Sequence, residues 1–153
     1  MDKSQRLDES QIKEYFATKN EVIAVYLFGS RAEGVARPDS DLDIAVLIED
    51  QAEDHFAYRM ALAEDLEKLA GIQTEVVILH EVPLLLQFQV LKHGKLLFER
   101  DPSQRAAYQM RLMSRYYDYK RFFDFHSRSL RKSIKEGGLG RGSRRDHVPP
   151  AQA

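Results

Sequence analysis

The sequence has 153 residues, of which 43% are hydrophobic and 31% are charged, and it contains no cysteine. This composition is typical of a single folded domain that is large enough to bury a core. The absence of cysteine excludes disulfides and thiolate metal sites, and a cytoplasmic location is the default expectation for such a chain. No apolar run reaches the roughly 18 residues of a membrane span, and the polar start does not resemble a signal peptide, so no membrane association is expected.

The charge is distributed unevenly along the chain. Residues 1–101 carry 11 Lys and Arg against 20 Asp and Glu, a balance of −9. Residues 102–153 carry 12 against 4, a balance of +8. This split predicts an acidic catalytic half followed by a basic arm for an anionic partner. A basic helix that neutralises its own domain would give the same counts.

Apolar runs and turn residues predict the elements of the first hundred residues. Asp8 precedes an amphipathic pattern that predicts a helix over residues 8–19. Two nearly all-apolar strands are predicted at Val22–Phe28 and Leu42–Ile48, with a short helix from Gly29 to Gly34 between them. Downstream, the pattern predicts a helix over 53–70, a strand over 73–79, a helix over 84–93 and a strand over 95–98. In the helix over 53–70, the buried stripe is expected to contain Phe56, Met60, Ala63 and Leu66.

The connection between the first two strands has the most specific spacing in the chain. Gly29-Ser30 ends the first apolar run, and after ten further residues Asp41-Leu42-Asp43 opens the second. Because side chains alternate along a strand, Asp41 and Asp43 should point to one face, with Cα atoms roughly 6.5 Å apart. Two such carboxylates repel each other unless a cation lies between them.

Magnesium fits this arrangement because it is usually held by one or two carboxylates together with substrate phosphates. Gly29 lets the backbone approach a phosphate closely, and the N–H groups of a helix start would point at that anion. The pattern therefore predicts a metal-dependent site for a nucleoside triphosphate. An ordinary hairpin with acidic residues at its edge is the alternative.

This spacing of Gly-Ser and Asp-x-Asp resembles the signature of the polymerase-β-type nucleotidyltransferase superfamily. With Arg31 and Ser40 included, the stretch is similar to the minimal nucleotidyltransferases, the antitoxin partners of HEPN-domain toxins. The resemblance covers residues 10 to 100 and is strongest from Phe28 to Val46. It implies an α/β (α+β) fold with a small mixed β-sheet flanked by helices and followed by a long C-terminal helix.

The resemblance also implies the roles of the site residues. Asp41, Asp43 and a third carboxylate on the next strand, here Glu75, would ligate two Mg²⁺ ions and serve catalysis. The family usually has Asp at the third position, so direct ligation by the longer Glu75 is left open, and a surface Glu at a strand start is the alternative. The residues implied to bind the nucleotide are Gly29, Ser30, Arg31 and Ser40.

Members of the family transfer AMP from ATP to a tyrosine of a partner HEPN toxin, a ribonuclease, and so silence it. The same activity is therefore expected of this chain. One alternative is a small-molecule nucleotidyltransferase of the aminoglycoside type, although those enzymes have a larger second domain. The other is an antitoxin that binds its partner without catalysis. Direct binding of nucleic acid through the basic tail is less favoured.

The C-terminal third is predicted to be one long helix from Pro102 to about Lys135. Six aromatic residues lie between Tyr116 and Phe125, and we expect half of them to pack in the core and the rest to contact a partner. The expected organisation is a nucleotidyltransferase core over 1–101, an amphipathic helix over 102–136 that packs on core and partner, and a flexible basic tail over 137–153. The five histidines show no metal-ligand spacing and are expected at the surface or its boundary.

Overall fold

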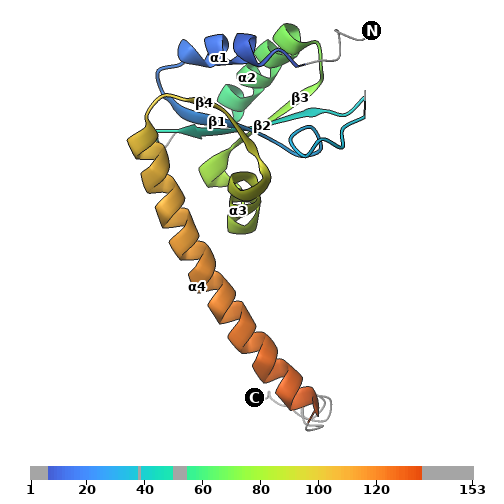
Figure 1. Cartoon of the computed structure of the whole chain (residues 1–153), viewed down its shortest axis with the longest axis vertical. Coiled ribbons are helices and arrows are strands. Elements are labelled where there is room, and N and C mark those ends of the chain that lie inside the picture. Colours follow the sequence, from blue (N-terminus) through green and yellow to red (C-terminus); the bar gives the residue numbers. More distant parts are fainter. Residues whose placement is uncertain (1–6, 38, 50–54, 136–153) are drawn as a thin grey trace, which may run out of the picture. The chain divides into compact units, whose positions relative to one another are not determined.

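The computed structural model describes residues 7–37, 39–49 and 55–135 (Figure 1). The elements follow one another as α1 (Glu9–Ala17), β1 (Val22–Phe28), β2 (Leu42–Ile48), α2 (His55–Ala70), β3 (Thr74–Ile78), the 3₁₀ turn η2 (Leu79–Glu81), α3 (Leu84–His93), β4 (Lys95–Glu99) and α4 (Pro102–Lys135). The bounds predicted for β1, β2 and α3 agree with the structure, and β3 is shorter by one residue at each end. The predicted start of α2 before residue 55 and the basic tail over 137–153 lie outside the described residues.

The four strands form one sheet in the order β3-β2-β1-β4. β1 pairs antiparallel with both β2 and β4, whereas β2 and β3 run parallel. The antiparallel β1–β2 pair is joined by the connector that contains the Gly-Ser motif, and the parallel pair is joined by α2, as a crossover requires. The predicted mixed sheet flanked by helices is therefore confirmed.

Side-chain alternation divides the sheet into two apolar faces. The α1 and α2 face buries the even-numbered residues of β2, with Ile12, Phe16, Leu62 and Leu66 packed on them. The opposite face buries Ala45 and Leu47 of β2 under residues of α3 and of the first turns of α4. Figure 1 shows α1 and α2 on one side of the sheet and α3 on the other. The odd-numbered residues of β2, including Asp43, thus face the α3 side.

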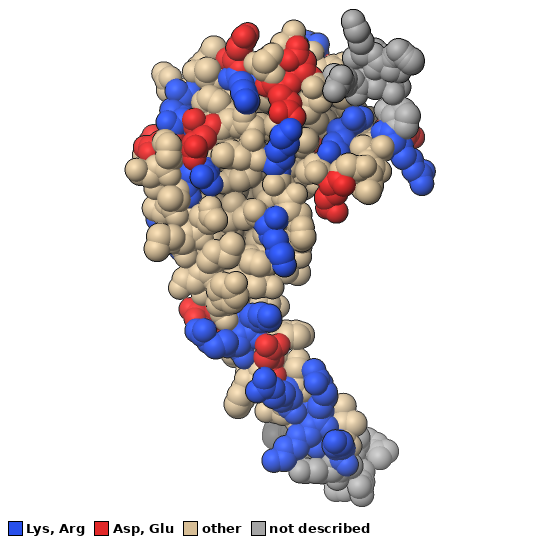
Figure 2. All heavy atoms as spheres, viewed as in Figure 1, with Lys and Arg blue, Asp and Glu red and all other residues tan. Residues whose placement is uncertain are grey.

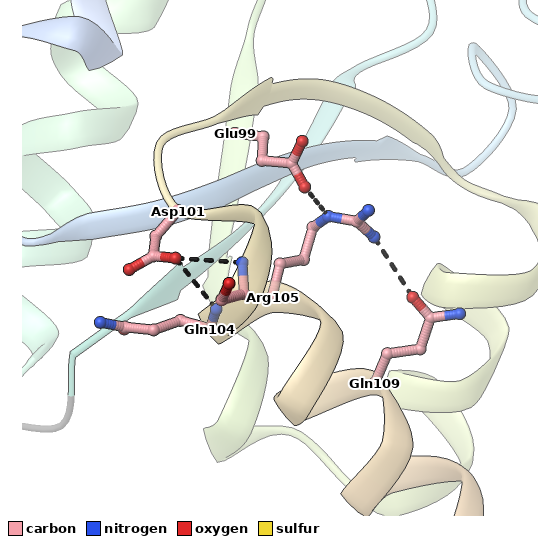
Figure 3. Close-up of polar contacts among 6 residues, drawn as sticks. Glu99, Asp101, Gln104, Arg105 and Gln109 are labelled. Atoms are coloured by element: carbon pink, nitrogen blue, oxygen red, sulfur yellow. Dashed lines mark hydrogen bonds and ion pairs between the residues drawn. The ribbon is translucent and has the colours of Figure 1, made fainter.

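The start of α4 is fixed to the core by polar contacts (Figure 3). The Asp101 carboxylate accepts hydrogen bonds from the backbone N–H groups of Ser103 at 3.0 Å and Gln104 at 3.1 Å, which caps the helix. Arg105 pairs with Glu99 at the end of β4. One turn later the buried Tyr108 hydroxyl donates to the Gln87 side chain of α3 at 2.6 Å. These contacts anchor the first turns of α4 beneath the sheet.

Two sequence predictions about local structure are wrong. Residues 29–34 form consecutive turns rather than a short helix. Their backbone bonds run from Ala32 and Glu33 back to the Gly29 carbonyl and do not continue as a helix. In α2, Phe56 and Met60 are exposed, and the buried face contains Leu62, Ala63 and Leu66. Apolar residues lie all around this helix, so periodicity alone could not select the buried face.

The described residues divide into two compact units, the first ending at Met113 and the second beginning at Ser114. In α4 the buried side chains are those of Tyr108 and Leu112, both in the first unit. None of the six aromatic residues between Tyr116 and Phe125 is buried, which overturns the expectation that half of them belong to the core. In the described part of the second unit, α4 has no second layer against which to bury them.

A membrane-spanning helix is not found among the described residues, because no helix there is both long enough and apolar enough.

Candidate active site

The carboxylates singled out from the sequence converge where β2 and β3 begin. Asp43 is the second residue of β2 and lies beside Glu75, the second residue of β3, in the parallel register. On its other side Asp43 is opposite Phe28, the last residue of β1. Asp41 lies just before the strand and is exposed, as is Glu75, whereas Asp43 is half-buried. The sheet thus brings Glu75 beside Asp41 and Asp43, which lie more than thirty positions earlier in the sequence.

Gly29 and Asp43 are in direct contact. Gly29 has a φ of +77°, a conformation that residues with a side chain rarely adopt. A Cβ at this position would lie 2.3 Å from the Asp43 carboxylate oxygen Oδ2, so only glycine leaves room for the carboxylate. The first turn after β1 is therefore packed against the acid at the start of β2.

The electrostatics of Asp43 show that negative charge accumulates here. Burial raises the pKa of the Asp43 carboxyl, and the negative charges of Glu75 and Asp41 raise it further. Among the described residues, none of these three carboxylates forms an ion pair with Lys, Arg or His. An uncompensated trio of oxygen ligands fits a divalent cation such as Mg²⁺, which prefers carboxylates and water. Asp41, Asp43 and Glu75 would hold such ions.

The turn after Gly29 presents backbone donors. The Gly29 and Ser30 carbonyls accept hydrogen bonds from Ala32, Glu33 and Val35. Within the described residues, the backbone N–H groups of Ser30 and Arg31 have no hydrogen-bond partner. Free amides beside a glycine in a turn form an anion-binding concavity. They are consistent with phosphate binding even though the predicted helix is absent.

Arg31 and Ser40 hold the connector that leads to Asp41. The Arg31 guanidinium donates to the Ser40 carbonyl oxygen from Nε at 3.2 Å and from Nη2 at 2.7 Å. The Ser40 hydroxyl in turn accepts from the Arg37 N–H at 2.8 Å. In the structure both residues therefore have a positioning role beside the site.

A small cavity of about 190 Å³ adjoins the site on the α3 face. It lies between the end of β1 and α3 and is lined by Phe28, Gly29, Glu33, Leu86, Gln89, Val90 and His93. Gln89 and His93 of α3 were not identified from the sequence, because no spacing connects α3 to the motif. A larger cavity of about 510 Å³ lies at the opposite end of β2, beside Leu47, Ile48 and Glu49, away from the carboxylates.

Comparison with known proteins decides the family. Residues 10–103 match the sequence model of the family described as polymerase beta, nucleotidyltransferase. The chain belongs to this family. The matched region runs from α1 to the start of α4 and includes Gly29, Ser30 and all three carboxylates. No curated protein matches this nucleotidyltransferase.

The nucleotidyltransferase is similar to chains of solved toxin–antitoxin complexes. It is 26% identical, with a TM-score of 0.64, to a chain of a toxin–antitoxin complex with AMP-PNP, and the match covers 86% of this chain and 98% of the other. A variant of the toxin–antitoxin complex MntA-HpeT is also 26% identical, with a TM-score of 0.63 and the same coverage. A complex of the tri-AMPylated HEPN toxin of Shewanella oneidensis with its MNT antitoxin shares the fold at 24% identity and a TM-score of 0.57, over 84% of this chain and 93% of the other. The protein is therefore an MNT antitoxin-like nucleotidyltransferase.

Proposed function

We propose that this nucleotidyltransferase is an antitoxin that transfers AMP from ATP to a tyrosine of a cognate HEPN toxin, and that the transfer neutralises the toxin. The observation that carries this proposal is the packing of Asp43 against Gly29, with the charges of Glu75 and Asp41 beside it. The proposal is supported by the similar chain in a complex with AMP-PNP and by the MNT antitoxin found with an AMPylated HEPN toxin.

The proposed reaction is an in-line displacement at the α-phosphorus of ATP. The tyrosine oxygen forms a bond to the α-phosphorus, the bond to the β-phosphate oxygen breaks, and pyrophosphate leaves. The amides of Ser30 and Arg31 would hold the β- and γ-phosphates, and Glu75 would accept the proton of the attacking hydroxyl. Bound Mg²⁺ would neutralise charge on the attacking and leaving oxygens. The protein contributes mainly position and charge, as this class of reaction requires.

The acceptor is proposed to be a protein because the site offers little enclosure for a small molecule. Small-molecule pockets have about 300–1,000 Å³, and the cavity beside Gly29 has about 190 Å³. Among the described residues no further domain closes over the carboxylates. A macromolecular partner would bring its own surface to the site. This argues against the aminoglycoside type of acceptor.

The experiment is to incubate the full chain with α-labelled ATP, Mg²⁺ and the HEPN protein encoded beside it. Label on a tyrosine of the HEPN protein, with loss of its ribonuclease activity, is expected. The variant Asp41→Asn with Asp43→Asn should bind the toxin but transfer no label, and the exposed Asp39→Asn serves as the matched control.

Two results would contradict the proposal. No label on the toxin would exclude adenylyl transfer to it. Unchanged neutralisation by the Asp41→Asn, Asp43→Asn variant would instead indicate an antitoxin that acts by binding alone.

A further inference from the structure

A second group of metal-ligating side chains lies away from the carboxylates at the start of the sheet. His55 is the first residue of α2, and His80 and Glu81 belong to η2, which directly follows β3. Glu75 lies at the start of β3, so η2 is at the other end of that strand. The two groups are therefore separated by the length of β3.

The three side chains meet at one point. One potential ligand atom of each residue lies within 4.8 Å of the others. His55 Nδ1 is hydrogen-bonded to Glu81 Oε2, and the His55 and His80 rings meet edge to face with centroids 5.8 Å apart. His80 is the third member of this group, although it makes no contribution to the bond between His55 and Glu81.

The burial of His55 leaves one of its nitrogens unsatisfied. The side chain is only 9% exposed. Its Nε2 is buried and finds no hydrogen-bond partner in the part of the chain that the structure describes. A cation shared with Glu81 would instead bind at Nδ1, the ring nitrogen that faces Glu81, in place of the proton of that hydrogen bond.

We propose that His55, His80 and Glu81 bind a transition-metal cation of the Zn²⁺ class. Imidazole nitrogens suit Zn²⁺, Cu²⁺ and Ni²⁺, whereas Mg²⁺ prefers oxygen ligands, so this site differs in chemistry from the carboxylate trio. Two histidines and one glutamate are three protein ligands and leave one position for water. His80 also lines the cavity of about 510 Å³, which provides access from solvent. The ion would connect the start of α2 to the end of β3.

The competing explanation is that His55 and Glu81 are only a hydrogen-bonded pair. His80 separates the two explanations because its removal leaves that pair intact. His80→Ala is therefore the decisive variant. Glu81→Gln, which preserves side-chain shape at an exposed residue, is the second. His93→Ala is the matched control, since it removes an exposed histidine at the end of α3.

The test is a Zn²⁺ titration of the full, tag-free chain against a chelating indicator, with Mg²⁺ and ATP saturating so that the carboxylate trio is occupied. Wild type and His93→Ala should each bind one Zn²⁺ and show a higher thermal unfolding temperature with the ion. His80→Ala should bind at least ~10–100-fold more weakly, the loss that even a supporting residue of a metal site causes. Glu81→Gln should also be weakened.

Equal Zn²⁺ affinity in wild type, His80→Ala and Glu81→Gln would overturn the proposal, as would the absence of Zn²⁺ binding by wild type. A loss of Zn²⁺ binding in Asp41→Asn, Asp43→Asn with retention in His80→Ala would also overturn it, because the ion would then belong to the carboxylate trio. Circular dichroism shows whether each variant is folded. The rate of AMP transfer by His80→Ala and Glu81→Gln is measured as well, so that failure of the Zn²⁺ proposal can be distinguished from failure of the proposed function.

Discussion

Gly29 and Asp43 bring the two halves of the sequence motif into contact. The positive φ of Gly29 turns the chain sharply after β1, and the missing side chain makes room for the carboxylate. Gly34, five residues later, has a similar φ of +75°, yet a Cβ there would meet nothing within 4 Å. The two glycines thus share the same backbone requirement but differ in their surroundings.

This difference provides a matched pair of substitutions. Gly29→Ala and Gly34→Ala should each lower the free energy of unfolding by about 1–2 kcal/mol, because both place a side chain in the left-handed region. Gly29→Ala should also displace the Asp43 carboxylate and reduce transfer by about a hundredfold or more, whereas Gly34→Ala should retain activity. The measurements are thermal unfolding and the rate of AMP transfer. Equal inactivation by both variants would show that the turn, and not the contact with Asp43, matters.

The raised pKa of Asp43 predicts a pH-dependent stability of the metal-free protein. Because the folded state holds the Asp43 proton more tightly than the unfolded chain, stability falls as pH rises from the ordinary pKa of 3.8 through the raised value. Asp43→Asn should therefore be more stable than wild type above this window, and the difference should vanish below it. Unfolding temperatures measured against pH with a chelator test this, with Asp39→Asn as the control. A wild type as stable as Asp43→Asn at neutral pH would contradict the prediction.

At the scale of elements, the Arg100 side chain links the end of α1 to the sheet. The Arg100 guanidinium, directly after β4, donates to the carbonyls of Val22, Phe16 and Ala17 at 3.0 Å and of Lys19 at 3.1 Å. The last carbonyls of a helix have no partner within the helix and carry partial negative charge. Arg100 thus satisfies the end of α1 and the start of β1 together.

Substitution of Arg100 should reveal this connection. Arg100→Gln should lower the free energy of unfolding by about 1–3 kcal/mol, because several carbonyls lose a charged donor. Arg100→Lys should recover only part of this loss, since one ammonium cannot reach all the carbonyls that the planar guanidinium reaches. Chemical denaturation measures both variants. As a control, Lys68→Gln removes a cation from the exposed pair with Glu64 and should have little effect. Full stability of Arg100→Gln would refute the role.

At the scale of the whole molecule, the second unit contains exposed aromatic residues on a basic helix. Its half-exposed or more exposed apolar side chains are Tyr117, Tyr119, Phe122, Phe123, Phe125, Leu130 and Ile134. Figure 2 shows Lys and Arg side chains gathered along the same helix. Exposed aromatic residues in such number mark a surface that binds another protein. We propose that this segment, residues 116–134, contacts the toxin.

Replacing two of these aromatic residues should weaken toxin binding without affecting the fold. Phe122→Ser with Phe125→Ser should raise the Kd for the HEPN partner by about 30-fold or more, the effect of losing about 2 kcal/mol at a binding hot spot. Thermal unfolding should change little, since both side chains are more than 60% exposed. Met110→Ser, which alters a 73% exposed residue in the first unit, is the control. Undiminished binding by the double variant would place the interface elsewhere.

The local sequence determined most of the fold and the core of the site. Uninterrupted apolar runs predicted β1 and β2, and the bounds predicted for α3 agree with the structure, because buried strands and helix ends leave clear local patterns. The spacing of Gly29, Asp41 and Asp43 likewise reflects one connector between neighbouring strands. Their proximity follows from local chain geometry, so the sequence was sufficient to propose them as a site.

Contacts between distant segments were decided only by the tertiary structure. α2 is apolar on several sides, so only packing against the sheet selected Leu62 and Leu66 over Phe56 and Met60. His55 and His80, separated by the whole of α2 and β3, meet because the parallel crossover returns the chain to the same end of the sheet. Sequence spacing gives information about residues that are close along the chain. Contacts between distant segments depend on how the strands pair and the helices pack.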